Sequence, residues 1–159
     1  MNIYDLFTLL LMLCCREVFA QEVESEQFPT FSECKQRTYA ERLACTHAKM
    51  AQYVYSEITY PFRAWLHNIQ GMVVVSFVVD ERGRMMDIEL KQAATDSADI
   101  SQMSAEEIAA RKEACEALNE EALRVVQKLA KISKKWTAGK INGKAVKIRY
   151  NLPIKFTIK

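Results

Sequence analysis

The cysteines and histidines of this chain are candidates for thiol chemistry and for metal binding. Cys34 and Cys45 enclose a short, mostly polar loop. A disulfide that closes such a loop would stabilise the fold by about 3 kcal/mol, and we predict that these two residues are joined in this way. Cys115 would remain as a free thiol, and its position in an apolar helical stripe predicts that it is buried.

The same residues do not predict catalysis or a metal site. Redox enzymes use paired thiols such as C-x-x-C, and the sequence contains no such pair. No known ligand spacing relates the candidate metal ligands Cys34, Cys45, His47 and His67. We therefore expect no catalytic residue, no metal and no cofactor, and the chain is predicted not to be an enzyme. A thiol-based activity centred on Cys115 is the weakest of three hypotheses.

Charge is distributed unevenly along the chain. The formal net charge of +2 is too small to predict a nucleic-acid partner. Between Lys131 and Lys159, however, the sequence has many basic residues and no acidic residue. Two interpretations remain open for this segment: a solvated face of a sheet, or a surface that attracts an acidic peptide or an anionic membrane.

The last part of the chain has the pattern of a strand at the edge of a sheet. Apolar residues alternate with polar ones from Val146 to Ile158, as expected for a half-buried strand. Pro153 has no N–H to donate, which favours an edge position. An extended peptide could then pair with the open side of the strand, and the candidate peptide-binding residues are Lys147, Arg149, Asn151 and Lys155. The alternative is that these residues protect the edge against aggregation.

Other elements must support this strand. The pattern predicts a helix that starts near Thr46 as N-cap and ends before Pro61. A valine-rich strand at 72–79 and an alternating strand at 84–91, with Met86, Ile88 and Leu90 facing inward, predict a hairpin that turns at Gly83. Ser104 and Glu107 form a capping-box pattern before a helix that continues to about Ile132. The segment 92–118 is predicted to be a helical insertion.

The first residues have the pattern of an export signal. An apolar run of about ten residues is too short to cross a bilayer as a helix, and small residues before Gln21 predict cleavage there. We predict a signal peptide at 1–20, a leader with the disulfide at 21–45, and one domain at 46–159. The protein would then be exported to the periplasm. Acylation of Cys14 or Cys15, which would make a lipoprotein, is the alternative.

Several segments in the second part of the chain occur in a specific order. They are Tyr60-Pro61 with Ala64, the Gly71–Gly83 hairpin, Glu121–Val126, Trp136–Val146, and Leu152-Pro153-Ile154 with Phe156. Their order and spacing resemble the C-terminal domain of the TonB family, from about Met50 to Lys159. The resemblance implies an α+β fold with two helices packed on one face of a three-stranded antiparallel sheet. It also implies that the partner is an extended segment of an outer-membrane receptor, and a cysteine pair before the first helix also occurs in that family.

The sequence departs from the energy transducers of that family. They have a membrane helix and a long proline-rich spacer, whereas this chain has three prolines in all. We therefore predict a periplasmic, TonB-like binding module that supports energised transport, with inner-membrane motor proteins as further candidate partners. The alternative is a structural or assembly protein of the envelope that dimerises, or that docks through its edge strand or the 92–118 insertion.

Overall fold

A three-stranded antiparallel sheet forms the centre of the protein. The computed structural model describes residues 26–132 and 136–158. Within these ranges the sheet contains β3 (Gly71–Val79), β4 (Met85–Gln92) and β8 (Ile148–Phe156), in the order β4-β3-β8. The middle strand β3 is the valine-rich segment, whose β-branched side chains suit a buried strand. The predicted signal peptide lies outside the described residues.

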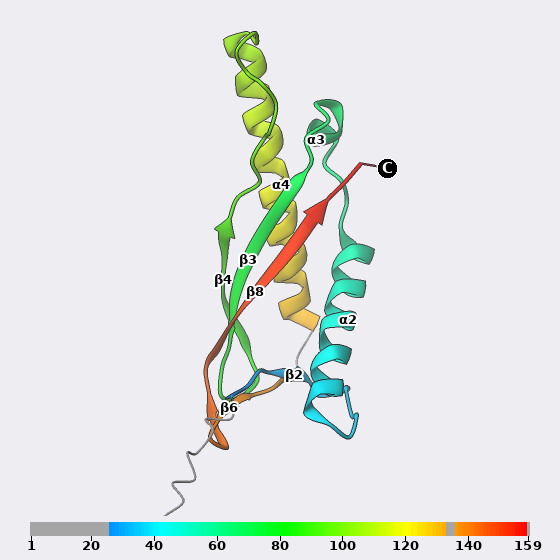
Figure 1. Cartoon of the computed structure of the whole chain (residues 1–159), viewed down its shortest axis with the longest axis vertical. Helices are drawn as coiled ribbons and strands as arrows, with labels where there is room; N and C mark the ends of the chain where they lie inside the picture. Colours follow the sequence, from blue (N-terminus) through cyan, green and yellow to red (C-terminus); the bar gives the residue numbers. More distant parts are fainter. Residues whose placement is uncertain (1–25, 133–135, 159) are drawn as a thin grey trace, which may run out of the picture.

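Helices cover one face of this sheet. They are α2 (Tyr39–Glu57), the short α3 (Phe62–Leu66) and the long α4 (Ala105–Ile132). Figure 1 shows α4 behind β3 and β4, and α2 beside β8. The predicted class, α+β with two helices on one face of a three-stranded antiparallel sheet, is confirmed, and the short α3 is an additional helix.

The core lies between the helices and the sheet. Val73, Val75, Phe77 and Val79 point from β3 toward the helices and are fully buried. From α4 they meet the predicted apolar stripe, of which Leu118, Ala122, Val125 and Val126 have no exposed surface. Ile108, a predicted member of that stripe, is 37% exposed because it lies in the first turn of α4, beyond the sheet. The periodicity of the sequence therefore identified the core faces of both elements.

The first helix begins earlier than the sequence pattern predicted. Thr38 is the N-cap of α2: its hydroxyl accepts from the Glu41 amide, and the Glu41 carboxylate accepts from the Thr38 amide, both at 3.2 Å. This reciprocal pair satisfies two amides that a helix start leaves unpaired. The prediction of Thr46 as N-cap is wrong. Thr46 is fully buried inside α2, where its hydroxyl accepts from the Phe31 amide at 2.9 Å.

The second hairpin strand contains an irregularity that the alternation did not predict. Asp87 has a φ of +51°, and the pairing of β3 with β4 shifts between Ser76 and Val78. This β-bulge adds one residue to β4, so the faces change along the strand. As a result Met85 packs against the core, while Met86 pairs with Val78 on the other face of the sheet. Met86 therefore does not point inward with Ile88 and Leu90, and the prediction for Met86 is wrong.

The segment 92–118 contains no helix separate from α4. An irregular connection follows β4, and α4 then continues as one helix of 28 residues. The connection is attached to the helix by Asn119, whose side-chain oxygen accepts from the Ala94 amide at 2.7 Å. The predicted helical insertion is therefore an irregular connection followed by the first half of α4.

Short strands at one end of the molecule join the start of the described chain to the segment between α4 and β8. β1 (Glu26–Gln27) pairs with β6 (Gly139–Ile141), which also pairs with β7 (Lys144–Val146). β2 (Thr30–Phe31) pairs with β5 (Trp136–Thr137). The residues predicted as a leader thus contribute strands to the fold. The alternating run that begins at Val146 is not one strand, because β7 belongs to the hairpin around Asn142 and Gly143.

Candidate functional site

The predicted edge strand β8 is an edge of the central sheet. In the described part of the chain β8 pairs with β3 alone, along nine residues from Ile148 to Phe156. The pairing has no shift in register along this length. β8 therefore presents a straight, regular outer side, which Figure 1 shows next to α2.

The backbone of alternate residues faces this outer side. The Lys155 amide donates to the hydroxyl of Tyr55, a residue of α2, at 3.4 Å, so it points away from β3. In a strand, the N–H and C=O groups of one residue point to the same side, and those of the next residue point to the other side. The backbone groups of Arg149, Asn151 and Pro153, at every second residue before Lys155, therefore point outward too. This arrangement explains why Pro153 is tolerated, since its missing N–H would otherwise interrupt the ladder with β3. We call Arg149, Asn151, Pro153 and Lys155 the outer row.

The side chains of the outer row lie on the face of the sheet opposite the helices. Arg149, Asn151, Pro153 and Lys155 are exposed, whereas Tyr150, Ile154 and Phe156 between them are buried. Lys147, the remaining predicted binding residue, is exposed in the connection between β7 and β8. The structure therefore brings Arg149, Asn151 and Lys155 into one row and places Lys147 just before it.

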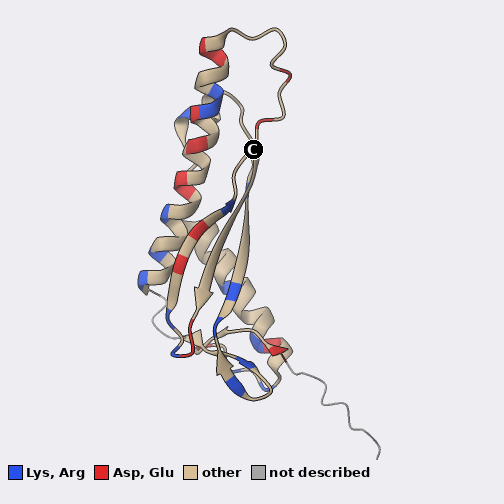
Figure 2. Ribbon diagram, turned by 90° about the vertical axis from the view of Figure 1, so that its left-hand side faces the viewer, with Lys and Arg blue, Asp and Glu red and all other residues tan. Residues whose placement is uncertain are grey.

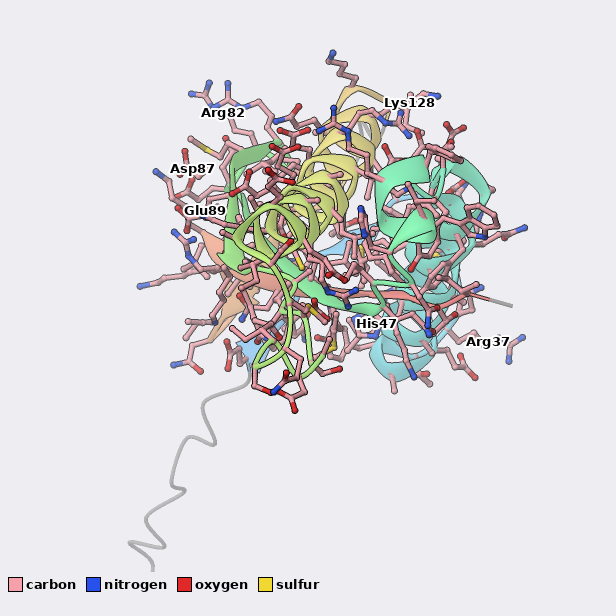
Figure 3. All side chains as sticks on the ribbon, turned by 90° about the horizontal axis from the view of Figure 1, so that it is seen from above. Arg37, His47, Arg82, Asp87, Glu89 and Lys128 are labelled. Carbon is pink, nitrogen blue, oxygen red and sulfur yellow. A yellow bond between two sulfur atoms is a disulfide. The ribbon has the colours of Figure 1, made fainter. Side chains whose placement is uncertain are left out.

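Arg149 reaches across the sheet. Its Nη1 donates to the Ser76 hydroxyl on β3 at 2.9 Å and also contacts the Glu89 carboxylate on β4. Figure 3, seen from above, shows Asp87 and Glu89 on the β4 side of the molecule, away from α2. Arg149 thus has an acidic partner, and its guanidinium is partly neutralised.

Other cations near β8 have no acidic partner. Within the described ranges, Lys144, Lys147 and Lys155 take part in no ion pair. Figure 2 shows basic residues on β8 and on the neighbouring β6–β7 hairpin. An acidic peptide that lies along β8 would therefore be attracted to the strand and to the hairpin before it.

An aromatic cluster fixes β8 from the helix side. Tyr150 stacks on Phe77 at a centroid distance of 5.3 Å and also contacts Trp136. Its hydroxyl donates to the Pro29 carbonyl at 2.7 Å, and burial raises the pKa of Tyr150. Trp136 is buried and belongs to the core. These contacts hold the outer row in a fixed position.

The predicted disulfide is present. Cys34 and Cys45 are bonded, with Cα atoms 5.9 Å apart, and the bond joins the segment after β2 to α2. Cys115 is a free, buried thiol, as predicted. It lies at a mostly apolar pocket of about 280 Å³ whose lining includes Ile100, Ile108 and Arg111. Burial raises the pKa of the Cys115 thiol, which disfavours the reactive thiolate.

The sequence pattern did not identify Tyr55, a residue beside β8. Its role depends on the position of α2 beside the strand, and no local signal marks that position. An exposed aromatic patch lies on α3, where Phe62 and Trp65 stack at 5.9 Å and are 70% and 55% exposed.

None of the helices within 26–132 and 136–158 is both long and apolar enough to cross a bilayer.

No family model and no curated protein matches the sequence. Among the solved structures that match are two NMR solution structures of the C-terminal domain of TonB from Helicobacter pylori. One is 20% identical and has a TM-score of 0.47 over 81% of this chain and 94% of that chain. The other is 21% identical and has a TM-score of 0.43 over 69% of this chain and 90% of that chain. These are the folds to which the chain is similar.

Proposed function

We propose that this protein is a periplasmic binding module that takes up an extended peptide as an additional strand along β8. The observation that carries the proposal is the outer row, whose backbone groups point away from β3. An added strand would pair with the Arg149 and Asn151 amides and with the carbonyls of the row. This mode of binding uses main-chain hydrogen bonds for affinity and side chains for selectivity.

The opposite edge of the sheet is less suited to this role. The pairing of β4 with β3 shifts at two places, and bulges twist a strand and interrupt the regular spacing of its backbone groups. β8 pairs without a shift, so its outer groups keep the spacing that a new strand requires. The two edges therefore differ in regularity, and β8 is the better template.

The expected affinity is modest. Four or five backbone hydrogen bonds contribute about 1 kcal/mol each, and association consumes much of that sum. Cationic side chains near the strand would add selectivity for acidic peptides. A low affinity suits a partner that is bound and released repeatedly.

The class of partner comes from the resemblance of the sequence to the TonB C-terminal domain. We propose that the peptide is a segment of an outer-membrane receptor and that binding supports energised transport. Export by the segment 1–20, with or without acylation of Cys14 or Cys15, would bring the domain to that partner. Motor proteins of the inner membrane are further proposed partners.

Peptide titration followed by NMR tests the proposal. A receptor-derived peptide added to the ¹⁵N-labelled protein should shift the amide signals of β8 and protect the Arg149 and Asn151 amides from hydrogen exchange. N-methylation of the peptide at successive positions should abolish binding at every second position, because only alternate amides face β8. The proposal is wrong if the β8 signals do not respond at high micromolar peptide or if N-methylation has no period of two.

The outer row also favours a second candidate function. Two copies of β8 could pair antiparallel, which would make a homodimer of the structural or assembly type. Sedimentation of the protein over a range of concentrations tests this. A concentration-dependent dimer whose Asn151 amide is protected would support self-association, and a monomer throughout would exclude it.

A further inference from the structure

We infer that the site on β8 has two different ends: Tyr55 stops an added strand at Lys155, and Lys144 with Lys147 bind acidic residues at the other end. The structure thus assigns a short extended peptide that is acidic at one end as the ligand. This inference rests on the proposed function and adds the length, position and charge pattern of the peptide.

Tyr55 marks the first end because it occupies a position that a new strand would need. Its hydroxyl accepts from the Lys155 amide, as a carbonyl of an added strand would do. Tyr55 is 53% exposed, so its ring extends beside β8 rather than into the core. Since Pro153 has no N–H, the next outward donors are Asn151 and Arg149. Strand addition is therefore confined to the first half of β8.

The helix α2 runs beside this part of the strand. The His47 ring meets the Tyr150 ring edge-on at 6.2 Å, and Tyr55 meets Lys155 further along both elements. α2 and β8 therefore run in the same direction. His47, Ala51 and Tyr55 lie four residues apart and share one face of α2, and all are exposed. Figure 3 shows that His47 belongs to the α2 side of the molecule. Side chains of a bound peptide that point toward the helices would contact His47, Ala51 and Tyr55.

Lysines mark the second end. Lys144 ends the turn of the β6–β7 hairpin, and Lys147 precedes β8, so both lie before the first residue of the outer row. Both are exposed, and neither has an ion-pair partner among the described residues. By sheet register the acidic residues nearest to these lysines are Asp80, which follows Val79 opposite Ile148 and is paired with Arg84, and Glu26, which is opposite Ile141. A peptide that extends past Arg149 would bring its own carboxylates to these two cations.

Defined peptides test the inference. Three blocked eight-residue peptides of alternating threonine and valine would carry two glutamates at the N-terminal end, two at the C-terminal end, or none. One of the two acidic peptides should bind threefold to tenfold more tightly than the other two, because two surface ion pairs contribute about 1 kcal/mol together. The double variant K144E/K147E should remove that difference. Lys91→Glu, which changes an exposed lysine on β4, should leave it unchanged.

Hydrogen exchange tests the role of Tyr55. In the wild-type complex the Arg149 and Asn151 amides should become protected, whereas exchange at Lys155 should not slow on binding. Tyr55→Ala removes both the ring and the acceptor, so the Lys155 amide should then become protected when the peptide binds. Protection of Lys155 in the wild-type complex, or equal binding of both acidic peptides, would overturn the inference. Failure of all three peptides to affect Arg149 and Asn151 would instead refute the proposed function, and the inference with it.

Discussion

The Arg111 guanidinium holds the Asp96 carboxylate at two points, with Nε to Oδ2 at 2.5 Å and Nη2 to Oδ1 at 3.1 Å. Asp96 belongs to the connection after β4, and Arg111 belongs to α4. Arg111 also donates to the His67 carbonyl at 3.2 Å, just after α3. The pair therefore fastens the connection and α3 to the same helix.

This pair predicts a dependence of stability on pH. The hydrogen bond from Arg111 lowers the pKa of Asp96 in the folded protein. The stabilisation is present above the unfolded pKa of about 3.9 and is lost as the pH falls through the folded pKa. Asp96→Asn should cost about 1–2 kcal/mol at pH 7, because the pair is only partly screened by solvent. Urea unfolding from pH 7 to pH 2.5 should show a smaller loss on acidification in Asp96→Asn than in the wild type.

An exposed acidic residue of α4 provides the control for this experiment. Glu120 has no ion pair within the described residues. Glu120→Gln should therefore follow the wild-type pH profile. The prediction is wrong if the stability of Asp96→Asn follows the wild-type pH profile as closely as that of Glu120→Gln does.

The disulfide should stabilise the domain. Reduction, or the double variant C34S/C45S, should lower the free energy of unfolding by about 2–4 kcal/mol, because the bond restricts the unfolded chain. Thermal unfolding with and without reductant measures the difference. Cys115→Ser is the matched control: since Cys115 is unpaired, this variant should respond to reductant as the wild type does. An unchanged melting temperature on reduction would contradict the prediction.

Thr46 should be sensitive to loss of its hydroxyl. It joins two elements, because the hydroxyl accepts from the Phe31 amide in β2 and donates to the Arg42 carbonyl in α2 at 2.8 Å. Thr46→Val keeps the shape but leaves the buried Phe31 amide without a partner, at a cost of about 1–3 kcal/mol. Thr46→Ser keeps the hydroxyl and loses one methyl group, at about 0.8 kcal/mol. Chemical denaturation should rank the valine variant as the less stable, and the reverse order would show that the methyl group matters more.

Two glycines with similar backbone angles should respond differently to alanine. Gly83 has a φ of +73° and Gly143 has a φ of +78°, so a side chain at either position costs about 1 kcal/mol in strain. A Cβ at Gly83 would also lie 2.0 Å from the Trp136 carbonyl oxygen, whereas a Cβ at Gly143 meets nothing within 4 Å. Gly83→Ala should therefore lower the melting temperature far more than Gly143→Ala. Equal decreases in melting temperature would contradict the prediction, because they would mean that the backbone at Trp136 shifts to make room for the added Cβ.

Some of these features were predictable because they depend on neighbours in the sequence. Alternation identified the buried face of β3, whereas the pairing of β6 with β7 was not predicted. The capping box formed by Thr38 and Glu41 is an equally local signal. The start of the helix was nevertheless predicted too late, because the apolar stripe on which that prediction depends begins after the capping box. The bulge at Asp87 had no such signal, since it depends on how β4 fits against β3.

The sequence by itself indicated where β3, β8 and the long helix lie, although not the exact ends of β8, and that β8 has an apolar face and a basic face. It also determined that Pro153 cannot donate to a ladder. Only the tertiary structure decided that α2 lies beside β8, that Tyr55 contacts the Lys155 amide, and that Lys144 and Lys147 stand at the start of the strand. Local patterns report which side of a segment avoids water, whereas the neighbour of a sheet edge is set by packing between segments far apart in the chain.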